Sequence, residues 1–295
     1  MELYKVTIKL ESSLVTPLKG DTIWGHIVWG IANHEGEEAV NSFLNECKSD
    51  VPAFIVSSAF PHNMLCKPIP PVQKRQKEMT PAKYAEIKKN KKSIYTNASQ
   101  YINIQADSKE SIRKPFVSVE VTHNTMNRFT NTVNDGGLYA VSEHWPEVQL
   151  FDIYIVSGYE VARIKQLIIW AFENGFGADA STGKGKITVT GEPEKITTKC
   201  KTNLYMALGP FVLSENSKIS DLKADTFIRT GKIGGTFANY LQPWKKTVVL
   251  FNEGAVFTSE DPMLFIGNLL TDIHSDSRIC QSGFAPVIPI NENME

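Results

Sequence analysis

The sequence predicts an α+β fold, in which a first unit of β-α-β-β-α-β order carries a large insertion and a strand-rich half follows. Residues 4–10 and 150–156 have the patterns of a half-buried and a fully buried strand. Residues 22–32 and 160–173 place apolar side chains at helical spacing. The insertion is indicated by residues 61–147, which interrupt these patterns with prolines and basic side chains.

The first strand and the first helix follow from side-chain spacing. Apolar side chains alternate with Lys5, Thr7 and Lys9, so one face of this strand is apolar and the other is basic. Asp21 is expected to cap the helix that begins at Thr22. The apolar stripe of that helix consists of Ile23, Trp24, Ile27, Val28 and Ile31.

The insertion follows a second strand, predicted at residues 53–59. Between residues 67 and 92, basic residues outnumber acidic ones by nine to two. Pro81 is expected to start a short helix there. Residues 116–123 and 138–141 predict the strands of a hairpin, with a polar turn at residues 134–137. The alternative is a solvated, partly disordered charged loop.

The remaining elements complete the first unit and begin the second half. Residues 150–156, 160–173 and 187–189 predict strand, helix and strand. The complete order is the ferredoxin-like one, which RNA-recognition domains share, although the aromatic stacking motif of those domains is absent. In the second half, residues 203–208, 247–251 and 284–290 predict strands, and residues 262–272 predict a helix.

A glycine-rich segment, residues 175–186, joins the second helix to the last strand of the first unit, and we call it the glycine loop. Glycine lets backbone amides approach a polyanion without a Cβ in the way. The loop also contains side chains that can contact phosphate oxygens, namely Ser181, Thr182, Lys184 and Lys186. These features favour nucleic acid or a nucleotide as the ligand. The spacing differs from a Walker A motif, which runs from strand into helix. The alternative is a flexible helix-to-strand connection.

Composition limits the kind of partner. The chain has 295 residues, a formal net charge of −1 and a sequence pI of about 6.6. Because free-standing nucleic-acid binders are usually basic, we expect any RNA or DNA contact to be confined to one face. The four cysteines are scattered, which argues against a zinc site or disulfides and for a cytoplasmic location. We expect no cofactor and no metal, and no apolar run reaches membrane-spanning length.

Four segments together carry a family resemblance. The first is residues 16–30, TPLKGDTIWGHIVWG, and the second is residues 123–130, HNTMNRFT, with GGLY at residues 136–139. The third is the glycine loop, and the fourth is residues 283–290, GFAPVIPI. With these segments the chain resembles the RAMP superfamily of CRISPR proteins. Within it, the chain is similar to the Csm-type subunit that caps the 5′ end of crRNA in type III-A effector complexes.

The resemblance implies a fold and a role. The fold would be two ferredoxin-like (RRM-like) β-α-β-β-α-β domains, at residues 1–195 and 196–295, with a hairpin in the insertion 61–147 of the first. The role would be to bind the repeat-derived 5′ tag of crRNA, with target RNA as a further candidate ligand. The protein partners would be the large polymerase-like subunit and a backbone RAMP subunit, and the chain itself would not be an enzyme.

The resemblance also implies which residues contact RNA. In the glycine loop these are Gly177, Ser181, Thr182, Gly183, Lys184, Gly185 and Lys186. In the insertion, residues 123–130 would wedge between guide and target, with His123, Asn124 and Arg128 as the contacts. The alternative is that these are turn-forming polar residues of a hairpin. Lys245, which follows Trp244, belongs either to a basic stacking patch for single strands or to an ordinary surface turn.

His26 carries the main alternative, a metal-independent crRNA-processing endoribonuclease. An exposed imidazole can act as general acid or base, and relatives in this superfamily cleave RNA with a histidine. However, no second histidine is near in sequence, and about a hundred residues follow the glycine loop, whereas the processing nucleases carry it close to the C-terminus. RNA contact or helix packing is therefore the preferred role of His26. A scaffold that contacts only proteins is a third candidate.

Two glycines flank His26 within the predicted first helix. Gly25 and Gly30 each cost the helix about 1 kcal/mol relative to alanine. We therefore expect a close neighbour on this helix, either a strand or an RNA backbone.

Overall fold

The computed structural model describes residues 1–69, 93–104, 114–199, 202–214, 217–235, 237 and 242–291. The first unit forms a four-stranded sheet in the order β2-β7-β1-β8, in which all neighbours are antiparallel. Its strands are β1 (Glu2–Leu10), β2 (Phe54–Pro61), β7 (Leu150–Ser157) and β8 (Ile187–Ile196). With α1 (Gly20–Cys47) and α3 (Val161–Phe172), the predicted β-α-β-β-α-β order of the first unit is confirmed.

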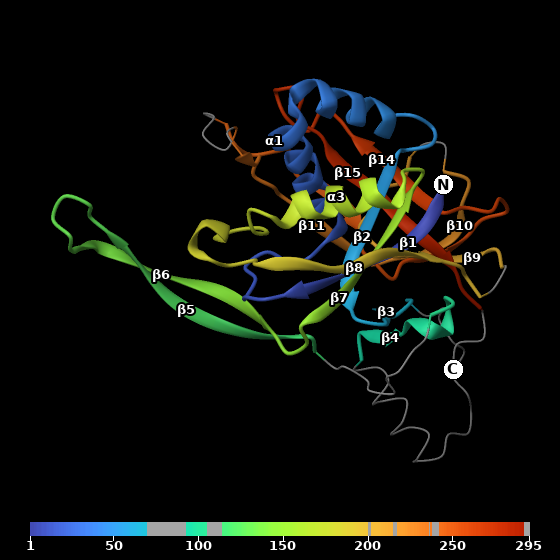
Figure 1. Cartoon of the computed structure of the whole chain (residues 1–295), viewed down its shortest axis with the longest axis horizontal. Helices are drawn as coiled ribbons and strands as arrows, with labels where there is room; N and C mark the ends of the chain where they lie inside the picture. The colour runs from blue at the N-terminus through green and yellow to red at the C-terminus, as the bar shows by residue number, and fades with distance from the viewer. Residues whose placement is uncertain are drawn as a thin grey trace, which may run out of the picture.

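Both helices pack on one face of this sheet (Figure 1). The strand residues Val6 and Ile8 pack in the same core as Ile27 of α1 and Ile168 of α3, because each lies on the apolar side of its element. Helix α1 extends well beyond the predicted residue 32, and it kinks at Gly36, where φ is 85°. The extension was missed because residues 33–47 are mostly polar, so the apolar stripe fades there.

The two helix glycines have different surroundings. A Cβ on Gly30 would lie 2.7 Å from Cβ of Trp170, so α1 and α3 approach closely at this point. The prediction of a close neighbour is confirmed for Gly30, and the neighbour is a helix. A Cβ on Gly25 would meet no atom within 4 Å, so this glycine faces open space.

The C-terminal strands form a five-stranded sheet in the order β10-β13-β9-β15-β14 and a separate two-stranded ribbon. The sheet contains β9 (Leu204–Ala207), β10 (Ser220–Lys223), β13 (Val256–Thr258), β14 (Phe265–Leu270) and β15 (Gln281–Pro289). The ribbon pairs β11 (Thr226–Arg229) with β12 (Val248–Phe251). The strands predicted at residues 203–208, 247–251 and 284–290 are confirmed.

The helix predicted at residues 262–272 is wrong, because β14 occupies this segment and pairs with β15. Gly267 has a φ of 105°, which an α-helix does not contain. No α-helix occurs in the described residues beyond 199. A second β-α-β-β-α-β unit is therefore not seen in that part of the chain.

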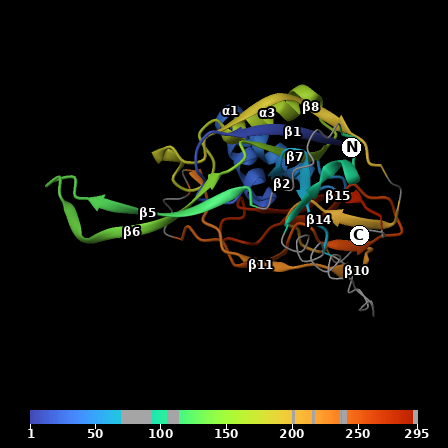
Figure 2. The ribbon, with the colours of Figure 1, turned by 90° about the horizontal axis from the view of Figure 1, so that it is seen from below.

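The two sheets pack face to face, and Figure 2 shows the C-terminal strands β10, β11 and β14 below the strands of the first sheet. Leu3, Tyr154 and Val156 of the first sheet share a buried cluster with Met206 and Phe284 of the second. The molecule thus has three layers, and the predicted halves share one apolar interface.

The insertion contains the expected hairpin, with strands longer than predicted. Two short strands and a turn come first, β3 (Met64–Cys66), β4 (Tyr95–Asn97) and η1 (Ala98–Gln100). Then β5 (Phe116–Met126) pairs with β6 (Val133–Pro146), and the hairpin projects far from the body (Figure 1). The turn lies at residues 127–132, and the predicted turn at 134–137 is wrong because it lies inside β6. The helix predicted from Pro81 lies outside the described residues.

Candidate nucleic-acid interface

The glycine loop is closed at its neck by backbone hydrogen bonds. The Phe176 N–H donates to the Gly185 carbonyl at 2.9 Å, and the Gly185 N–H donates to the Ser13 carbonyl at 2.8 Å. Gly185 has a φ of 67°, and a Cβ there would lie 2.0 Å from the Phe176 carbonyl oxygen, so only glycine fits. This glycine is therefore explained by the geometry of the neck.

Two side chains from the N-terminal part of the chain anchor the start of the loop. The Gly177 N–H donates to His26 Nε2 at 3.2 Å, and the Ala178 N–H donates to Thr16 Oγ1 at 2.9 Å. A Cβ on Gly177 would lie 2.4 Å from Cβ of Thr16, so this glycine is also required by packing. Residues about 160 positions apart in sequence thus shape the loop.

His26 is engaged by the protein itself. Besides accepting from Gly177, its ring packs against Phe176 with centroids 4.7 Å apart. Burial lowers the pKa of His26 to about 4, so the imidazole is neutral near pH 7. Its position makes it a support for the glycine loop.

Lys184 points away from the loop tip and pairs with the hairpin. Its Nζ lies 2.6 Å from Oε1 of Glu143 on β6, and 5.7 Å from the ring centroid of Trp145. The Ser13 hydroxyl donates to the other oxygen of Glu143 at 2.8 Å. Glu143 has no exposed surface, and the hydrogen bond from Lys184 lowers its pKa. Lys184, which the sequence predicts as an RNA contact, links the glycine loop to the hairpin in this structure.

The base of the hairpin is fixed at the same place. His144 of β6 and Leu14 exchange backbone hydrogen bonds of 2.7 and 2.9 Å. His123 Nε2 lies 3.8 Å from Glu143, and its ring stacks on Tyr139. The structure therefore brings His123, Lys184 and Glu143 together, and we call this meeting point the hairpin junction.

Sequence reasoning missed Glu143 and Ser13. One signal was present, because Val141, Glu143 and Trp145 share a strand face in β6, and Glu143 is the charged residue on an otherwise apolar face. A carboxylate at such a position needs a buried cation or hydrogen-bond donors. Which partner it has could not be read from the strand itself.

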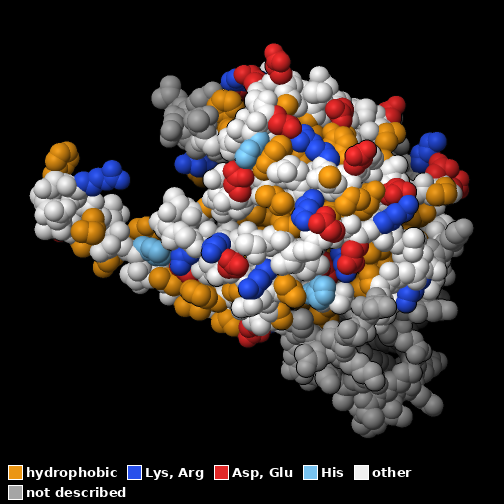
Figure 3. All heavy atoms as spheres, viewed as in Figure 1, with side chains coloured by type: hydrophobic (Ala, Val, Ile, Leu, Met, Phe, Trp, Pro, Cys, Tyr) orange, Lys and Arg blue, Asp and Glu red, His pale blue; other side chains and the backbone are white. Residues whose placement is uncertain are grey.

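The hairpin tip lies away from the junction. Asn127 Oδ1 accepts hydrogen bonds from the N–H groups of Phe129 and Thr130, at 2.9 and 3.4 Å, which shapes the turn. Arg128 is exposed at this tip, and the Phe129 side chain is 99% exposed. Figure 3 shows a deep notch between the tip and the body. Asn124 and Arg128 thus belong to the outer part of the hairpin, whereas His123 belongs to the junction.

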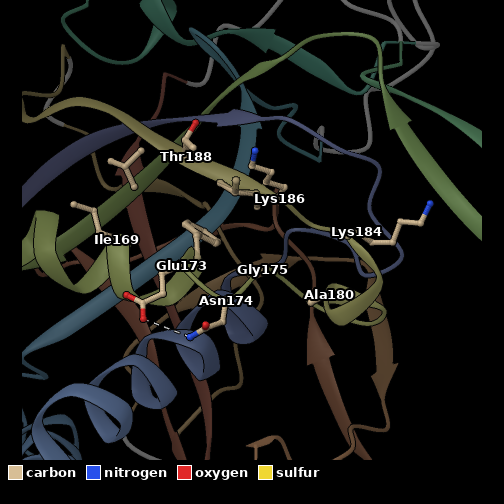
Figure 4. Close-up of a pocket in the computed structure, with 12 residues that line it drawn as sticks. Ile169, Glu173, Asn174, Gly175, Ala180, Lys184, Lys186 and Thr188 are labelled. Atoms are coloured by element: carbon tan, nitrogen blue, oxygen red, sulfur yellow. Dashed lines mark hydrogen bonds between the residues drawn. The ribbon is translucent and has the colours of Figure 1, made fainter.

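The outer side of the glycine loop borders a shallow groove of about 670 Å³ between α3 and β8. Figure 4 shows Lys184 and Lys186 reaching away from Glu173, which lies at the opposite end with Asn174. Lys186 is 70% exposed and pairs with Glu11 at 3.0 Å. Ser181, Thr182 and Gly183 are exposed, and the Thr182 hydroxyl donates to the Asp179 carbonyl. Lys186 and the two hydroxyl residues are therefore accessible polar groups at the loop end of the groove, and the exposed Glu173 and Asn174 lie at its other end.

Lys245 is not part of this site. It lies against Gly231, whose Cβ would meet Lys245 Cε at 3.0 Å, and burial lowers its pKa. The prediction that the nearby Asp21 caps the first helix is wrong, because α1 begins at Gly20 and Lys19 is its N-cap residue. Asp21 instead forms a buried bidentate ion pair with Arg229 of β11, at 2.7 and 2.8 Å. This pair ties the start of α1 to the C-terminal ribbon.

Two general features of the described residues concern metals and membranes. They contain no group of three or more His, Cys, Asp or Glu residues that could hold a metal ion. None of the helices in the described ranges has the length and apolar character needed to cross a membrane.

Comparison with known proteins gives a result at the level of structure. No protein-family model matches the sequence, and no curated protein matches it. A chain of a crystal structure of the Csm1–Csm4 cassette in complex with pppApA matches with a TM-score of 0.58 and 15% identity, covering 99% of this chain and 100% of that one. A chain of the Csm3–Csm4 subcomplex in the type III-A CRISPR-Cas interference complex matches with a TM-score of 0.54 and 12% identity, covering 99% and 100%.

Csm4 is the subunit common to these two assemblies. The chain therefore shares its fold with Csm4 along nearly its whole length. The resemblance to a Csm-type RAMP subunit is confirmed for the fold.

Proposed function

We propose that this chain is a non-catalytic RNA-binding subunit of a type III-A CRISPR-Cas interference complex. In that role it binds the 5′ repeat-derived tag of crRNA and docks against the large polymerase-like subunit and a backbone RAMP subunit. The observation that carries the proposal is the hairpin junction, where Glu143 joins the glycine loop to a long projecting hairpin. It occurs within a fold shared with Csm4, which is found with Csm1 and with Csm3 in the similar structures.

The glycine loop offers the means to hold a sugar–phosphate backbone. Lys186 supplies an accessible cation, and Ser181 and Thr182 supply hydroxyl groups. Several loop amides are already used internally, including those of Gly177, Ala178 and Gly185. Phosphate and ribose contacts at the loop therefore rest mainly on the tip, residues 179–183, and on Lys186.

The hairpin offers a second point of contact with RNA. Arg128 can pair with phosphate, and Phe129 can stack on a base, because aromatic rings and guanidinium planes bind unstacked bases. The notch between the tip and the body leaves room for a strand (Figure 3). In this proposal the tip wedges between guide and target, while the junction keeps the hairpin at a set angle to the glycine loop.

The non-catalytic part of the proposal is supported by His26. A general base must reach the proton that it removes and must have a pKa near the working pH. The His26 Nε2 accepts a hydrogen bond from Gly177, and its pKa is lowered to about 4. This imidazole is therefore poorly suited to activate a ribose hydroxyl.

The direct test uses labelled guide RNA with and without the 5′ tag, titrated on native gels with a duplicate of each sample under denaturing conditions. The titration is repeated with the large subunit present. We expect tighter binding of the tagged RNA and no cleavage. Lys186→Ala should weaken binding and reduce the slope of log K against log salt by about 0.7, the value for one contact to a single strand.

Lys165→Ala is the matched control, because Lys165 also forms an exposed lysine–glutamate pair, with Glu192, but lies on α3 away from the loop tip. It should leave both affinity and salt slope unchanged. Cleavage of the RNA would contradict the non-catalytic role, and equal affinity for tagged and untagged RNA in the presence of the large subunit would contradict tag binding.

A further inference from the structure

The β11–β12 ribbon has an inner and an outer face. On the inner face, Leu250 is fully buried. The ring centroid of Phe227 lies 5.1 Å from Lys19 Nζ and 5.1 Å from Arg229 Cζ. Arg229 in turn is held by Asp21. The ribbon is thus anchored on the body by one face, and its other face is held rigidly toward the surface.

The outer face consists of three successive cross-strand pairs. Ile228 lies opposite Val249, and their side chains are 70% and 59% exposed. Next, the hydroxyl groups of Thr230 and Thr247 lie 3.3 Å apart. The third pair is Lys232 with Trp244. Backbone hydrogen bonds continue the antiparallel pairing to these residues, beyond the ends of β11 and β12. We call these six residues the outer ribbon face.

Trp244 dominates the chemistry of this face. Its side chain is 59% exposed, although burial of a tryptophan would stabilise the fold. Lys232 Nζ lies 5.7 Å from the ring centroid, in a cation–π contact. Among the described residues, neither Lys232 nor the neighbouring Lys246 has a carboxylate within ion-pair distance, in contrast to Lys184 and Lys186.

We propose that the outer ribbon face is a second binding surface for single-stranded RNA, with Trp244 as its stacking residue. The unneutralised lysines favour an anionic ligand, and an exposed aromatic ring beside cations is the combination that binds single strands without sequence preference. The threonine pair lies between the aromatic and aliphatic ends and can meet ribose hydroxyls. From Ile228 to Lys232 the face is about 13 Å long, at about 3.3 Å per residue, which suits a short run of unstacked nucleotides.

This inference rests on the proposed function and deepens it, because it adds a surface that shares no residue with the glycine loop. It assigns different contributions to RNA binding to the two surfaces. The glycine loop distinguishes the tagged end, whereas the outer ribbon face contributes affinity for any single strand. Loss of the Trp244 side chain should therefore lower the affinity for tagged and for untagged RNA by the same factor.

The test is photocrosslinking and titration of the full-length chain with a uridine-only oligonucleotide, which lacks the tag. We expect a crosslink in the peptide that contains Trp244, and an affinity about tenfold lower in Trp244→Ala, in keeping with the loss of one stacked base. Trp244→Phe should recover most of the affinity. Lys232→Ala should reduce the salt slope by about 0.7.

Trp170→Ala is the matched control. Trp170 also lies beside a cation, with Arg163 Cζ at 5.3 Å, but its ring is covered by His34. It should leave oligouridylate affinity unchanged once circular dichroism shows that the variant is folded.

An unchanged affinity in Trp244→Ala, or no binding of oligouridylate by the wild-type chain, would overturn the inference, and the apolar part of the face would then be a protein contact. If oligouridylate binding depends on Trp244 but tagged guide RNA is not preferred with the large subunit present, the inference stands and the proposed tag binding fails.

Discussion

Glu143 sits at the root of an exposed hairpin without any exposed surface of its own. A buried carboxylate is tolerated only when cations and donors compensate its lost hydration, and Lys184 and Ser13 provide both. The glycine loop itself was predictable, because its glycines, hydroxyl groups and lysines are adjacent in sequence. The role of Lys184 at the hairpin junction was not predictable. In sequence, Glu143 lies about 40 residues from Lys184 and Ser13 about 170 residues from it, and local patterns carry no information about such pairing.

The Glu143–Lys184 pair should contribute to stability in a pH-dependent way. Lys184→Ala leaves the buried Glu143 without its cation, so we expect the free energy of unfolding at neutral pH to fall by about 2 kcal/mol. Because the folded pKa of Glu143 is lowered from 4.5, the contribution of its charge is complete above that pH and is lost as pH falls through the folded pKa.

The measurement is urea unfolding of the wild type, Lys184→Ala and Glu143→Gln at neutral pH and in acid. The stability difference between wild type and Glu143→Gln should shrink in acid. Lys186→Ala is the control, because its exposed pair should contribute less than about 1 kcal/mol. Identical unfolding curves for Lys184→Ala and the wild type would show that the pair does not hold the junction.

At the scale of elements, strand and helix patterns were read correctly where burial followed local periodicity. Examples are β1, whose apolar side chains alternate with polar ones, β7, which is apolar almost throughout, and α3, which has one apolar side facing a core. The helix prediction for the segment of β14 failed because its apolar residues suit a helix as well as a strand. Pairing with β15 makes this segment a strand. The hairpin turn was misplaced because Gly136 lies within β6, while the side chain of Asn127 builds the turn.

The outer hairpin should be separable from the rest of the fold. We expect a variant in which Asn-Gly replaces residues 125–137, joining Asn124 to Leu138, to keep His123, Glu143 and Trp145 and therefore to unfold at an unchanged temperature. It should still prefer tagged guide RNA but lose crosslinks to target RNA. Thermal unfolding and crosslinking of the assembled complex measure both effects.

Phe129→Ala is the milder form of the same experiment, because this side chain is almost fully exposed and its loss leaves the fold unchanged. It should also reduce target crosslinks. Loss of tag preference in the shortened variant would assign the tip to the tag site and contradict the wedge role.

At the scale of the whole molecule, the first sheet is buried on both sides. The helices cover one face, and the C-terminal strands cover the other through Leu3, Ile55, Tyr154 and Val156. The order of the first unit was predictable from its elements. The shared interface was not, because both faces of a doubly covered strand are apolar and the pattern does not say what covers them.

The two halves should therefore unfold as one cooperative unit. Differential scanning calorimetry of the full chain should give a single transition whose calorimetric and van't Hoff enthalpies agree. A fragment ending at residue 199 should aggregate or bind a hydrophobic dye, because it exposes the face that the C-terminal strands cover. Two resolved transitions, or a soluble fragment with native near-ultraviolet dichroism, would show that the halves are independent domains.

The closed neck of the glycine loop also bears on how such a chain can change over generations. The bonds of its tip are largely internal, from Thr182 and Lys184 to the Asp179 carbonyl and from Gly183 to the Ala180 carbonyl. Substitution or lengthening of residues 179–183 therefore leaves the scaffold intact, as in other loops whose ends are pinned. The tip can therefore change in sequence without rebuilding the protein, so that, in the proposed RNA-binding role, descendants of this chain could acquire a preference for another RNA end.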